Sequence, residues 1–397
     1  MEAPSKFQLD LGQTRITRSR TLRVYRIGLL LSFGIGILFS VTRLAIGQAR
    51  PGVTRISDAP TCSSCSIVLQ PIAILGGRDG PGEIDRQPLA IREDGLGRFW
   101  LLPGANEMPR VYSGTGAYVG TVGTKGAGPG EFLGPAALMP IPGDSMLIVD
   151  LFAARATVVG ADLKPRRTMI FPRDVEPELA IAWPRSVMLQ GWIATPQQAG
   201  LQLHRTSLAG REPTFLQSYS PDSGQWRRQF DWPAVVRAVP AQSGFWSYNT
   251  YRYRFTQWST DGTMIADYER EAAWFPRKDR VIPIGNTKTP PAPSLVRVIP
   301  GVEQRVWTIV NVPSPNWRRA WERVAKGSGD ISVSSIAFEN LYHSVVEEID
   351  LKSARVLSRT PMEKWIIAAF DGGRVAAYEV DAQGVPRVVI YALVHRR

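Results

Sequence analysis

The hydrophobic and polar positions of the chain divide it into one apolar stretch near the start and a long series of short strands after it. Residues 27–42 carry no charge, and Arg43 separates them from a last apolar stretch that ends at Gly47. A helix that reaches Gly47 is long enough to cross a hydrocarbon core of about 30 Å when the Arg43 side chain extends to the interface. We therefore expect a transmembrane helix over residues 27–47, preceded by a cytoplasmic basic tail over residues 1–26.

Small residues recur at every fourth position of this stretch, at Gly28, Ser32, Gly36 and Ser40. They share one helix face, which is the pattern that lets transmembrane helices pack closely. A cleaved secretory signal that ends at Ala49 is the alternative, because a basic region, an apolar core and small residues follow one another. The long basic region and the charge within the apolar run favour an uncleaved anchor. The positive-inside rule then predicts a single-pass protein of the bacterial inner membrane, with its bulk in the periplasm.

Beyond residue 65 the pattern changes to short apolar strands separated by turns, and two units of it repeat. Residues 80–83 and 128–131 both read Gly-Pro-Gly-Glu, at an offset of 48, and apolar strands follow each at matching positions. A period near 50 residues built from short strands is typical of propeller blades. The glycine-rich stretch 123–132, GTKGAGPGEF, resembles a phosphate loop when it is seen alone. Because the same motif occurs at residues 80–83, we interpret the stretch as a connector between blades. Glu131 is expected to accept hydrogen bonds from backbone N–H groups in it.

Later units keep the same rhythm of strands and turns with less sequence similarity. The last unit has three strands, and the strand at residues 66–75, SIVLQPIAIL, has no unit of its own. We expect these two to pair, because that closes the ring and leaves no exposed sheet edge. Six units fit best, and five or seven remain open. The later units cover residues 191–219, 244–269, 294–312 continued at 344–362, and 365–394.

The two motifs GRDGPGEI and GTKGAGPGEF, each followed by strand, glycine turn and strand, resemble the six-bladed NHL/TolB-like β-propeller family over residues 76–172. The resemblance implies an all-β fold, a six-bladed β-propeller over residues 66–397 that follows the transmembrane helix. Members of this family mostly serve as binding or scaffolding surfaces. A minority are lyases, lactonases or hydrolases.

Composition agrees with a turn-rich fold and limits the partners. The 36 Gly and 31 Pro residues favour short strands over long helices, and 44% hydrophobic residues are enough for a sizeable core. The net charge is +12, but residues 1–26 carry +4 of it. No basic stripe with interleaved aromatic residues is present, so nucleic acid is not an expected partner.

Cys62 and Cys65 are the only cysteines and lie in the linker that we expect over residues 48–65. On the oxidising side of a membrane a local disulfide is the expected state. A c-type haem site would need His after the second cysteine, where Ser66 stands, and a zinc site would need two more ligands.

Candidate catalytic residues are few. The three histidines, His204, His343 and His395, have no neighbouring residues that suggest a nucleophile–base relay. Asp150 and Asp371 lie near strand ends, where capping of a turn is the expected role. We therefore predict no catalytic residue, no cofactor and no metal site.

One helix is expected in an insertion at about residues 313–343, from an N-cap at Asn316 to a stop at Gly327. Trp317 and Trp321 share a face of this helix, and Arg318 makes it basic. The tryptophans either pack on the propeller or contact a partner or lipid headgroups.

These features together predict a non-enzymatic structural or interaction subunit. The transmembrane helix and the propeller would bind integral-membrane subunits of a larger assembly. The sequence is similar to the style of propeller that an accessory subunit of a bacterial photosynthetic reaction-centre/light-harvesting complex could use. The alternatives are a secreted propeller enzyme of lyase or lactonase type and a sugar- or peptide-binding propeller.

Overall fold

The structure is a computed structural model, and it describes most of the chain from residue 51 to residue 396. Within that range the described residues exclude 78–79, 105–106, 142, 172–179, 184–185, 191–202, 208, 211–213, 220–235, 242–243, 276–288, 302 and 321–337. The expected transmembrane segment 27–47, with Gly28, Ser32, Gly36 and Ser40, lies outside the described residues. No helix among the described residues is long and apolar enough to cross a membrane.

Six sheets account for most of the described residues. Five have four strands and one has five, and all their strand pairs are antiparallel except β1 with β20. The first three sheets follow one another along the chain. Sheet 1 contains β3 (Ala90–Glu93), β4 (Phe99–Leu102), β5 (Arg110–Tyr112) and β6 (Tyr118–Thr121). Sheet 2 contains β9 (Pro135–Ile141), β10 (Ser145–Asp150), β11 (Arg155–Val159) and β12 (Pro165–Ile170). Sheet 3 contains β13 (Ala180–Trp183), β14 (Ser186–Gln190), β15 (Leu203–Ser207) and β16 (Thr214–Tyr219).

The other three sheets continue the order, and two of them include a strand from the start of the described chain. Sheet 4 contains β17 (Val236–Ala241), β18 (Gly244–Asn249), β19 (Arg254–Ser259) and β20 (Met264–Arg270), with β1 (Val53–Ile56) as a fifth strand. Sheet 5 contains β21 (Ser294–Pro300), β22 (Arg305–Pro313), β23 (Tyr342–Asp350) and β24 (Arg355–Met362). Sheet 6 contains β25 (Ile366–Phe370), β26 (Arg374–Val380), β27 (Pro386–Arg396) and β2 (Ser66–Leu75).

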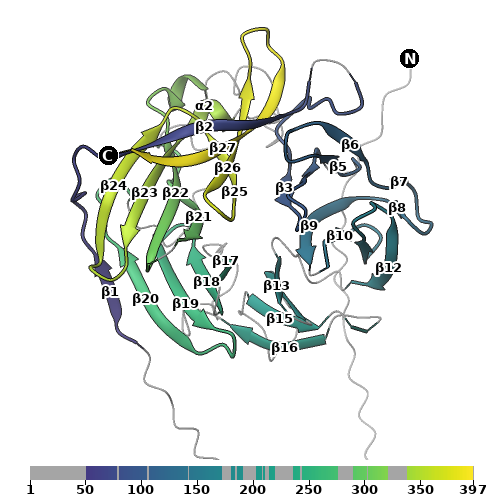
Figure 1. Ribbon diagram of the computed structural model, residues 1–397, viewed down its shortest axis with the longest axis horizontal. Helices are drawn as coiled ribbons and strands as arrows, with labels where there is room; N and C mark the ends of the chain where they lie inside the picture. The colour runs from purple at the N-terminus through teal and green to yellow at the C-terminus, as the bar shows by residue number, and fades with distance from the viewer. Residues whose placement is uncertain are drawn as a thin grey trace, which may run out of the picture. The chain divides into compact units, whose positions relative to one another are not determined.

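The sheets are arranged in a ring, as Figure 1 shows. The first strands of successive sheets contact one another in turn, from β3 to β9, β13, β17, β21 and β25, and β25 contacts β3 again. Antiparallel four-stranded sheets placed radially in a ring are a β-propeller, the all-β fold that the repeat predicted.

The pairing of residues 66–75 with the last unit is confirmed. β2 runs antiparallel to β27, with Ser66 opposite Arg396 and Leu75 opposite Val388. Sheet 6 therefore takes three strands from the C-terminal end of the chain and one from the N-terminal side.

The parallel pairing of β1 with β20, with Val53 opposite Asp267, was not expected. Nor were β13, β14 and β17, because residues 180–190 and 236–241 precede the points where the strand rhythm was recognised in sheets 3 and 4.

The stretch GTKGAGPGEF connects sheet 1 to sheet 2, as predicted. β7 (Thr124–Lys125) and β8 (Glu131–Phe132) form a small parallel pair, and the Glu131 carboxylate accepts the Gly128 N–H at 2.7 Å. Gly123 has a φ of +77°, and a Cβ there would lie 2.5 Å from the Phe132 ring. Glycine is therefore required at this position for the turn.

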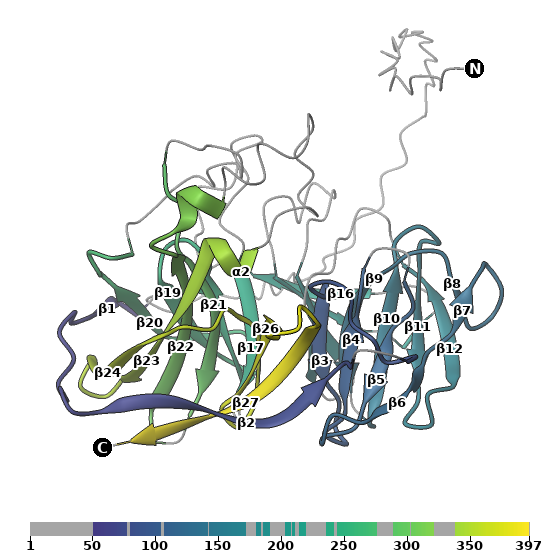
Figure 2. The ribbon, with the colours of Figure 1, turned by 90° about the horizontal axis from the view of Figure 1, so that it is seen from above.

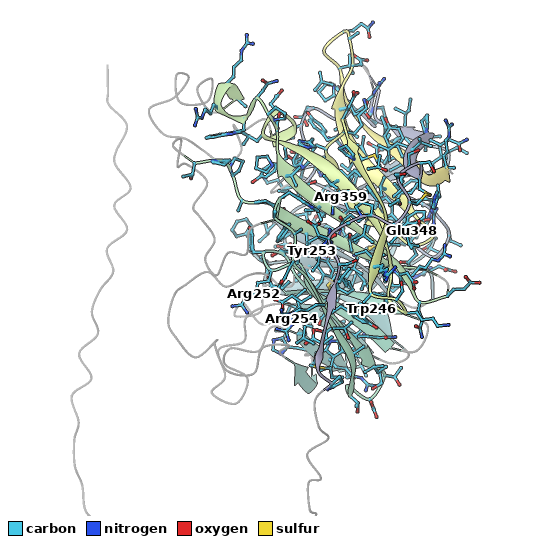
Figure 3. All side chains as sticks on the ribbon, turned by 90° about the vertical axis from the view of Figure 1, so that its left-hand side faces the viewer. Trp246, Arg252, Tyr253, Arg254, Glu348 and Arg359 are labelled. Carbon is cyan, nitrogen blue, oxygen red and sulfur yellow. A yellow bond between two sulfur atoms is a disulfide. The ribbon has the colours of Figure 1, made fainter. Side chains whose placement is uncertain are left out.

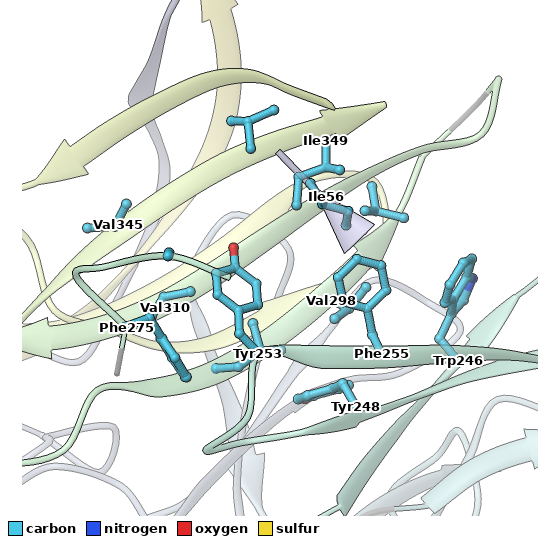
Figure 4. Packing of buried hydrophobic residues seen from close by; sticks show 14 of the residues in the cluster. Ile56, Trp246, Tyr248, Tyr253, Phe255, Phe275, Val298, Val310, Val345 and Ile349 are labelled. Atoms are coloured by element: carbon cyan, nitrogen blue, oxygen red, sulfur yellow. The ribbon is translucent and has the colours of Figure 1, made fainter. Parts of the chain in front are cut away.

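Apolar side chains fill the space between sheets 1 and 2, 4 and 5, 5 and 6, and 6 and 1. The largest such cluster lies between sheets 4 and 5, and Figure 4 shows Tyr248, Tyr253 and Phe255 packed with Val298 and Val310. Tyr253 and Phe255 are fully buried, and burial of such side chains stabilises a fold by roughly 1.5–3 kcal/mol each. Tyr253 also bonds through its hydroxyl to Glu347, so this apolar cluster adjoins a polar one.

Candidate functional site

Residues 51–65, which we call the N-terminal strap, bind the outer edges of sheets 4 and 5 before the chain enters β2. After β1, the Ser57 N–H donates to the Ala354 carbonyl oxygen at 3.1 Å, and the Cys62 N–H donates to the Leu357 carbonyl oxygen at 3.0 Å. Figure 2 shows the strap in purple, running from β1 around the outside of the ring to β2. One continuous segment thus covers the outer strands β20 and β24 and then supplies the outer strand of sheet 6.

A network of four charged side chains joins the strap to sheets 4 and 5, and we call these residues the clamp: Asp58 of the strap, Arg270, Glu347 and Arg359. The Arg270 guanidinium donates to both Glu347 carboxylate oxygens, at 3.0 and 3.1 Å. The same guanidinium donates to the Ser57 carbonyl oxygen at 3.1 Å and to the Asp58 carboxylate at 2.7 Å. Arg270 therefore joins sheet 4 to sheet 5 and to the strap at once.

Arg359 of β24 repeats this arrangement from the other side. Its Nε–H donates to Glu347 at 2.6 Å, and its terminal nitrogen donates to the Asp58 carboxylate at 2.6 Å. Two guanidinium groups and two carboxylates alternate around the clamp, so the formal charges of its four residues cancel. Charge-assisted bonds of this kind are roughly twice as strong as neutral ones.

Burial differs across the clamp and sets its electrostatics. The side chains of Arg270 and Glu347 are 0% exposed, whereas that of Asp58 is 47% exposed. Burial alone would raise the pKa of the Asp58 carboxyl, but hydrogen bonds from Arg270 and Arg359 hold that pKa below its ordinary value of 3.8. Burial, together with the neighbouring Glu347 charge, raises the pKa of Tyr253 well above 10.0, so its hydroxyl stays protonated and donates to Glu347.

Aromatic rings lie against both guanidinium groups. The Arg359 guanidinium lies 5.2 Å from the centroid of the Trp274 ring, and that of Arg270 lies 5.9 Å from the Tyr253 ring. Figure 3 shows this side of the molecule, with Tyr253, Arg254 and Arg359 labelled. Cation–π contacts of this kind contribute about 0.5–2 kcal/mol each.

A cavity of about 410 Å³ lies next to the clamp and shares Arg270 with it. Its walls combine both charges with an aromatic ring, and they include Arg252, Glu269, Glu271 and Phe275. The volume is within the range of small-molecule sites.

Each of the four charged groups of the clamp is bonded to at least one group of opposite charge, and Glu347 also accepts a hydrogen bond from the Tyr253 hydroxyl. Across the described parts of the chain, no group of three or more His, Cys, Asp or Glu side chains is placed to hold a metal ion.

Cys62 and Cys65 form a disulfide within the strap, with Cα atoms 5.3 Å apart. The disulfide closes a short loop between the last strap contact with β24 and the first residue of β2. The two serines at its tip are exposed.

The insertion in sheet 5 is described only at its ends. Residues 317–320 are helical, and a short helix α2 (Phe338–Leu341) leads into β23. Trp317 is 9% exposed and packs with Ala320 and Leu341, and the Arg318 guanidinium lies 5.4 Å from its ring centroid. Trp317 is therefore buried between the two described ends of the insertion. Trp321 lies outside the described residues.

The histidines are dispersed over three sheets. His204 is fully buried in β15, and burial lowers the pKa of His343 in β23. His395 of β27 lies 2.8 Å from Glu348 of β23, and Glu348 also accepts a bond from Arg305 at 3.2 Å. This contact joins sheet 6 to sheet 5.

The two candidate aspartates lie near strand ends: Asp150 is the last residue of β10, and Asp371 lies in the turn that follows β25. Asp150 is fully buried and accepts the backbone N–H groups of Leu133, Gly134 and Ala153 at 2.7–3.1 Å. Asp371 is exposed, and its carbonyl oxygen accepts from the Arg374 side chain at 3.4 Å. Both therefore serve turn geometry.

Comparisons with known proteins show similarity of fold only. The sequence matches no model of a known protein family and none of the curated protein sequences. Solved structures do resemble it. The fold is a β-propeller. A member of the DUF4221 family from Bacteroides vulgatus has a TM-score of 0.57 and 10% identity, covering 83% of this chain and 99% of that one.

Two further structures illustrate the range of these likenesses. A protein described as exported from Bacteroides fragilis has a TM-score of 0.56 and 11% identity, covering 86% of this chain and 99% of its own. A virginiamycin B lyase from Staphylococcus aureus has a TM-score of 0.39 and 10% identity, covering 82% and 99%. At such identities the likeness shows the fold alone, and it assigns no function to this chain.

Proposed function

We propose that this chain is a non-enzymatic, membrane-anchored interaction subunit, whose six-bladed propeller docks on an integral-membrane complex in the periplasm. The observation that carries the proposal is the N-terminal strap. The strap is fixed by β1, by the clamp and by β2, so a chain anchored upstream of Val53 would be joined to a firmly held part of the propeller.

The link between anchor and propeller is short. Only residues 48–52 separate the expected span from β1, and five extended residues reach about 18 Å at most. An anchored propeller gains a rigid connection to its membrane segment.

Two other features support an exported scaffold. The Cys62–Cys65 disulfide suits an oxidising compartment, and a B. fragilis protein of similar fold is described as exported. The charged residues of the clamp are bonded to one another, which suits a structural role better than a catalytic one.

The partner is proposed as a class, an integral-membrane assembly bound through the transmembrane helix and the propeller. Within that class, a photosynthetic reaction-centre/light-harvesting complex remains the specific candidate named from the sequence. The small-residue face of Gly28, Ser32, Gly36 and Ser40 is the part of the chain expected to pack against helices of that partner.

The test is extraction of native membranes with a mild detergent, followed by native electrophoresis and mass spectrometry of the band that contains this chain. We expect a chain that retains residues 1–49 and migrates with integral-membrane proteins. A Gly36→Leu variant should migrate apart from them, because leucine blocks close helix approach. A Leu38→Ala variant, off the small-residue face, should behave as the unaltered chain.

Two results would overturn the proposal. A soluble chain whose N-terminus lies near Arg50 would identify a secreted protein and favour the enzyme or ligand-binding alternatives. A full-length chain that migrates alone under the mildest extraction would remove the partner complex. Reaction-centre proteins in the shared band would support the photosynthetic candidate, and their absence from a shared band would exclude it.

A further inference from the structure

The Cys62–Cys65 disulfide lies where the strap passes from sheet 5 to sheet 6. On its N-terminal side, the Thr61 and Cys62 N–H groups donate to β24 carbonyl oxygens at 2.9 and 3.0 Å. On its C-terminal side, Ser66 is already opposite Arg396, and the Ile67 N–H donates to the Thr360 hydroxyl at 2.9 Å. The chain is therefore attached to sheet 5 before the disulfide, and after it to sheet 5 again, through Thr360 of β24, and to sheet 6.

The bridge shortens the strap at this junction. The Cα atoms of Cys62 and Cys65 lie 5.3 Å apart, whereas four extended residues would separate them by about 10 Å. Opening the disulfide therefore releases up to about 5 Å of chain between β24 and β2. Slack of that size exceeds the rise of about 3.3 Å per residue in a strand, so it permits β2 to loosen from β27.

The disulfide is also within reach of a reagent. Ser63 and Ser64, at the tip of its loop, are exposed, and the two cysteines are only partly buried. Thiol–disulfide exchange requires access of an attacking thiolate to one sulfur, and this loop offers it without unfolding of the sheets. A buried structural disulfide would react only on global unfolding.

We propose that Cys62–Cys65 is a redox-active clasp, a site for exchange with dithiols that sets the length of the strap and so the stability of ring closure. A thiolate of the dithiol attacks one Sγ atom, the Cys62–Cys65 bond breaks, and the other cysteine leaves as a thiolate. The second thiol of the dithiol then displaces the first cysteine from the mixed disulfide. The dithiol is oxidised to a disulfide, and two protons return to Cys62 and Cys65.

The experiment compares the full-length chain in detergent before and after treatment with dithiothreitol, by alkylation mass and by hydrogen exchange. We expect reduction of the folded chain, with both thiols alkylated. Amides of β2 should then exchange roughly 20-fold faster, from the loop-closure entropy of a four-residue loop. Amides of sheet 2, whose described strands pair with neither β1 nor β2, should be unchanged.

Two variants make the result decisive. Replacement of both cysteines, Cys62→Ser with Cys65→Ser, should give the fast β2 exchange without reductant and no response to it. The matched control, Ser63→Ala with Ser64→Ala, keeps the disulfide and should behave as the unaltered chain. The clasp is refuted if dithiothreitol reduces the disulfide only after urea unfolding. It is equally refuted if reduced and oxidised chains show the same β2 exchange.

Discussion

Replacement of Glu347 by glutamine should destabilise the propeller by about 3 kcal/mol. The side chain keeps its shape, but its negative charge is lost between two guanidinium groups, at 2.6–3.1 Å from their nitrogens. Removal of one partner of a buried ion pair costs about 3–5 kcal/mol, because the other charge is left uncompensated. The low end applies here, because Asp58 remains to neutralise one guanidinium and Arg359 is 24% exposed.

Thermal unfolding of the full-length chain in detergent measures this loss. For a domain of this size, each kcal/mol lowers the Tm by about 2 °C, so Glu347→Gln should lower it by about 6 °C. The control is Glu271→Gln, because the Glu271 side chain is 65% exposed and lies 3.7 Å from Arg55. An exposed pair is worth less than about 1 kcal/mol, so the control should change the Tm by about 2 °C or less.

A double-mutant cycle with Asp58→Asn separates the clamp from simple loss of a buried carboxylate. If the four residues act as one network, the two substitutions should be non-additive by more than about 0.5 kcal/mol. The reasoning fails if Glu347→Gln is as mild as Glu271→Gln. Strict additivity would show that the strap and the Arg270–Glu347 pair are energetically independent.

Three further predictions concern the strap, a connector turn and a buried cap. Because the pKa of Asp58 is lowered in the folded chain, its carboxylate stabilises the fold fully above pH 3.8, and this stabilisation is lost as the pH falls through the lower, folded pKa. The difference in urea stability between the unaltered chain and Asp58→Asn should therefore vanish in acid. A difference that stays constant with pH would contradict this prediction. Gly123→Ala combines a φ of +77° with overlap between the new Cβ and the Phe132 ring, and should lower the free energy of unfolding in urea by about 2–4 kcal/mol. Gly143→Ala, at a φ of +85° with no atom within 4 Å of the new Cβ, should lower it by about 1 kcal/mol. Equal losses would show that the overlap is unimportant. Asp150→Ala leaves three backbone N–H groups without their acceptor and should lower the free energy of unfolding by about 3 kcal/mol or more in the same assay. Asp150→Asn should be milder, because one side-chain oxygen remains. A loss below about 1 kcal/mol for Asp150→Ala would mean that water replaces the carboxylate.

The fold was largely accessible from the sequence because its evidence is local. A glycine motif repeated at an offset of 48, and strands at matching distances after it, are visible without knowledge of any distant contact. Pairing of residues 66–75 with the last unit followed from counting strands, and the register of β2 with β27 confirms it. β1 was not predicted, because its four residues, Val-Thr-Arg-Ile, are too few for the alternation of apolar and polar positions to distinguish a strand from a linker.

The clamp could not be predicted, because its members are far apart in the chain and ordinary in their local patterns. Arg270 and Glu347 are separated by 77 residues, and Asp58 is 212 residues from Arg270. One signal was present. Glu347 and Glu348 interrupt an apolar strand, so at least one of them had to point into a core, where a carboxylate requires a cationic partner. The identity of that partner depends on which sheets become neighbours, and periodicity does not specify this.

The strap also constrains the time at which the ring can be completed. β2 is made early, yet its partner β27 ends at Arg396, 330 residues after Ser66. A chain that emerges N-terminus first must keep Ser66–Leu75 unpaired until almost the whole sequence has appeared. Closing a loop of that length costs roughly 5 kcal/mol of chain entropy. The pairing of β2 with β27 is therefore expected to form only after sheets 4 and 5 have bound the strap. The propeller therefore closes last at the point where its two ends meet, and everything before that step is an open arc with an unpaired edge.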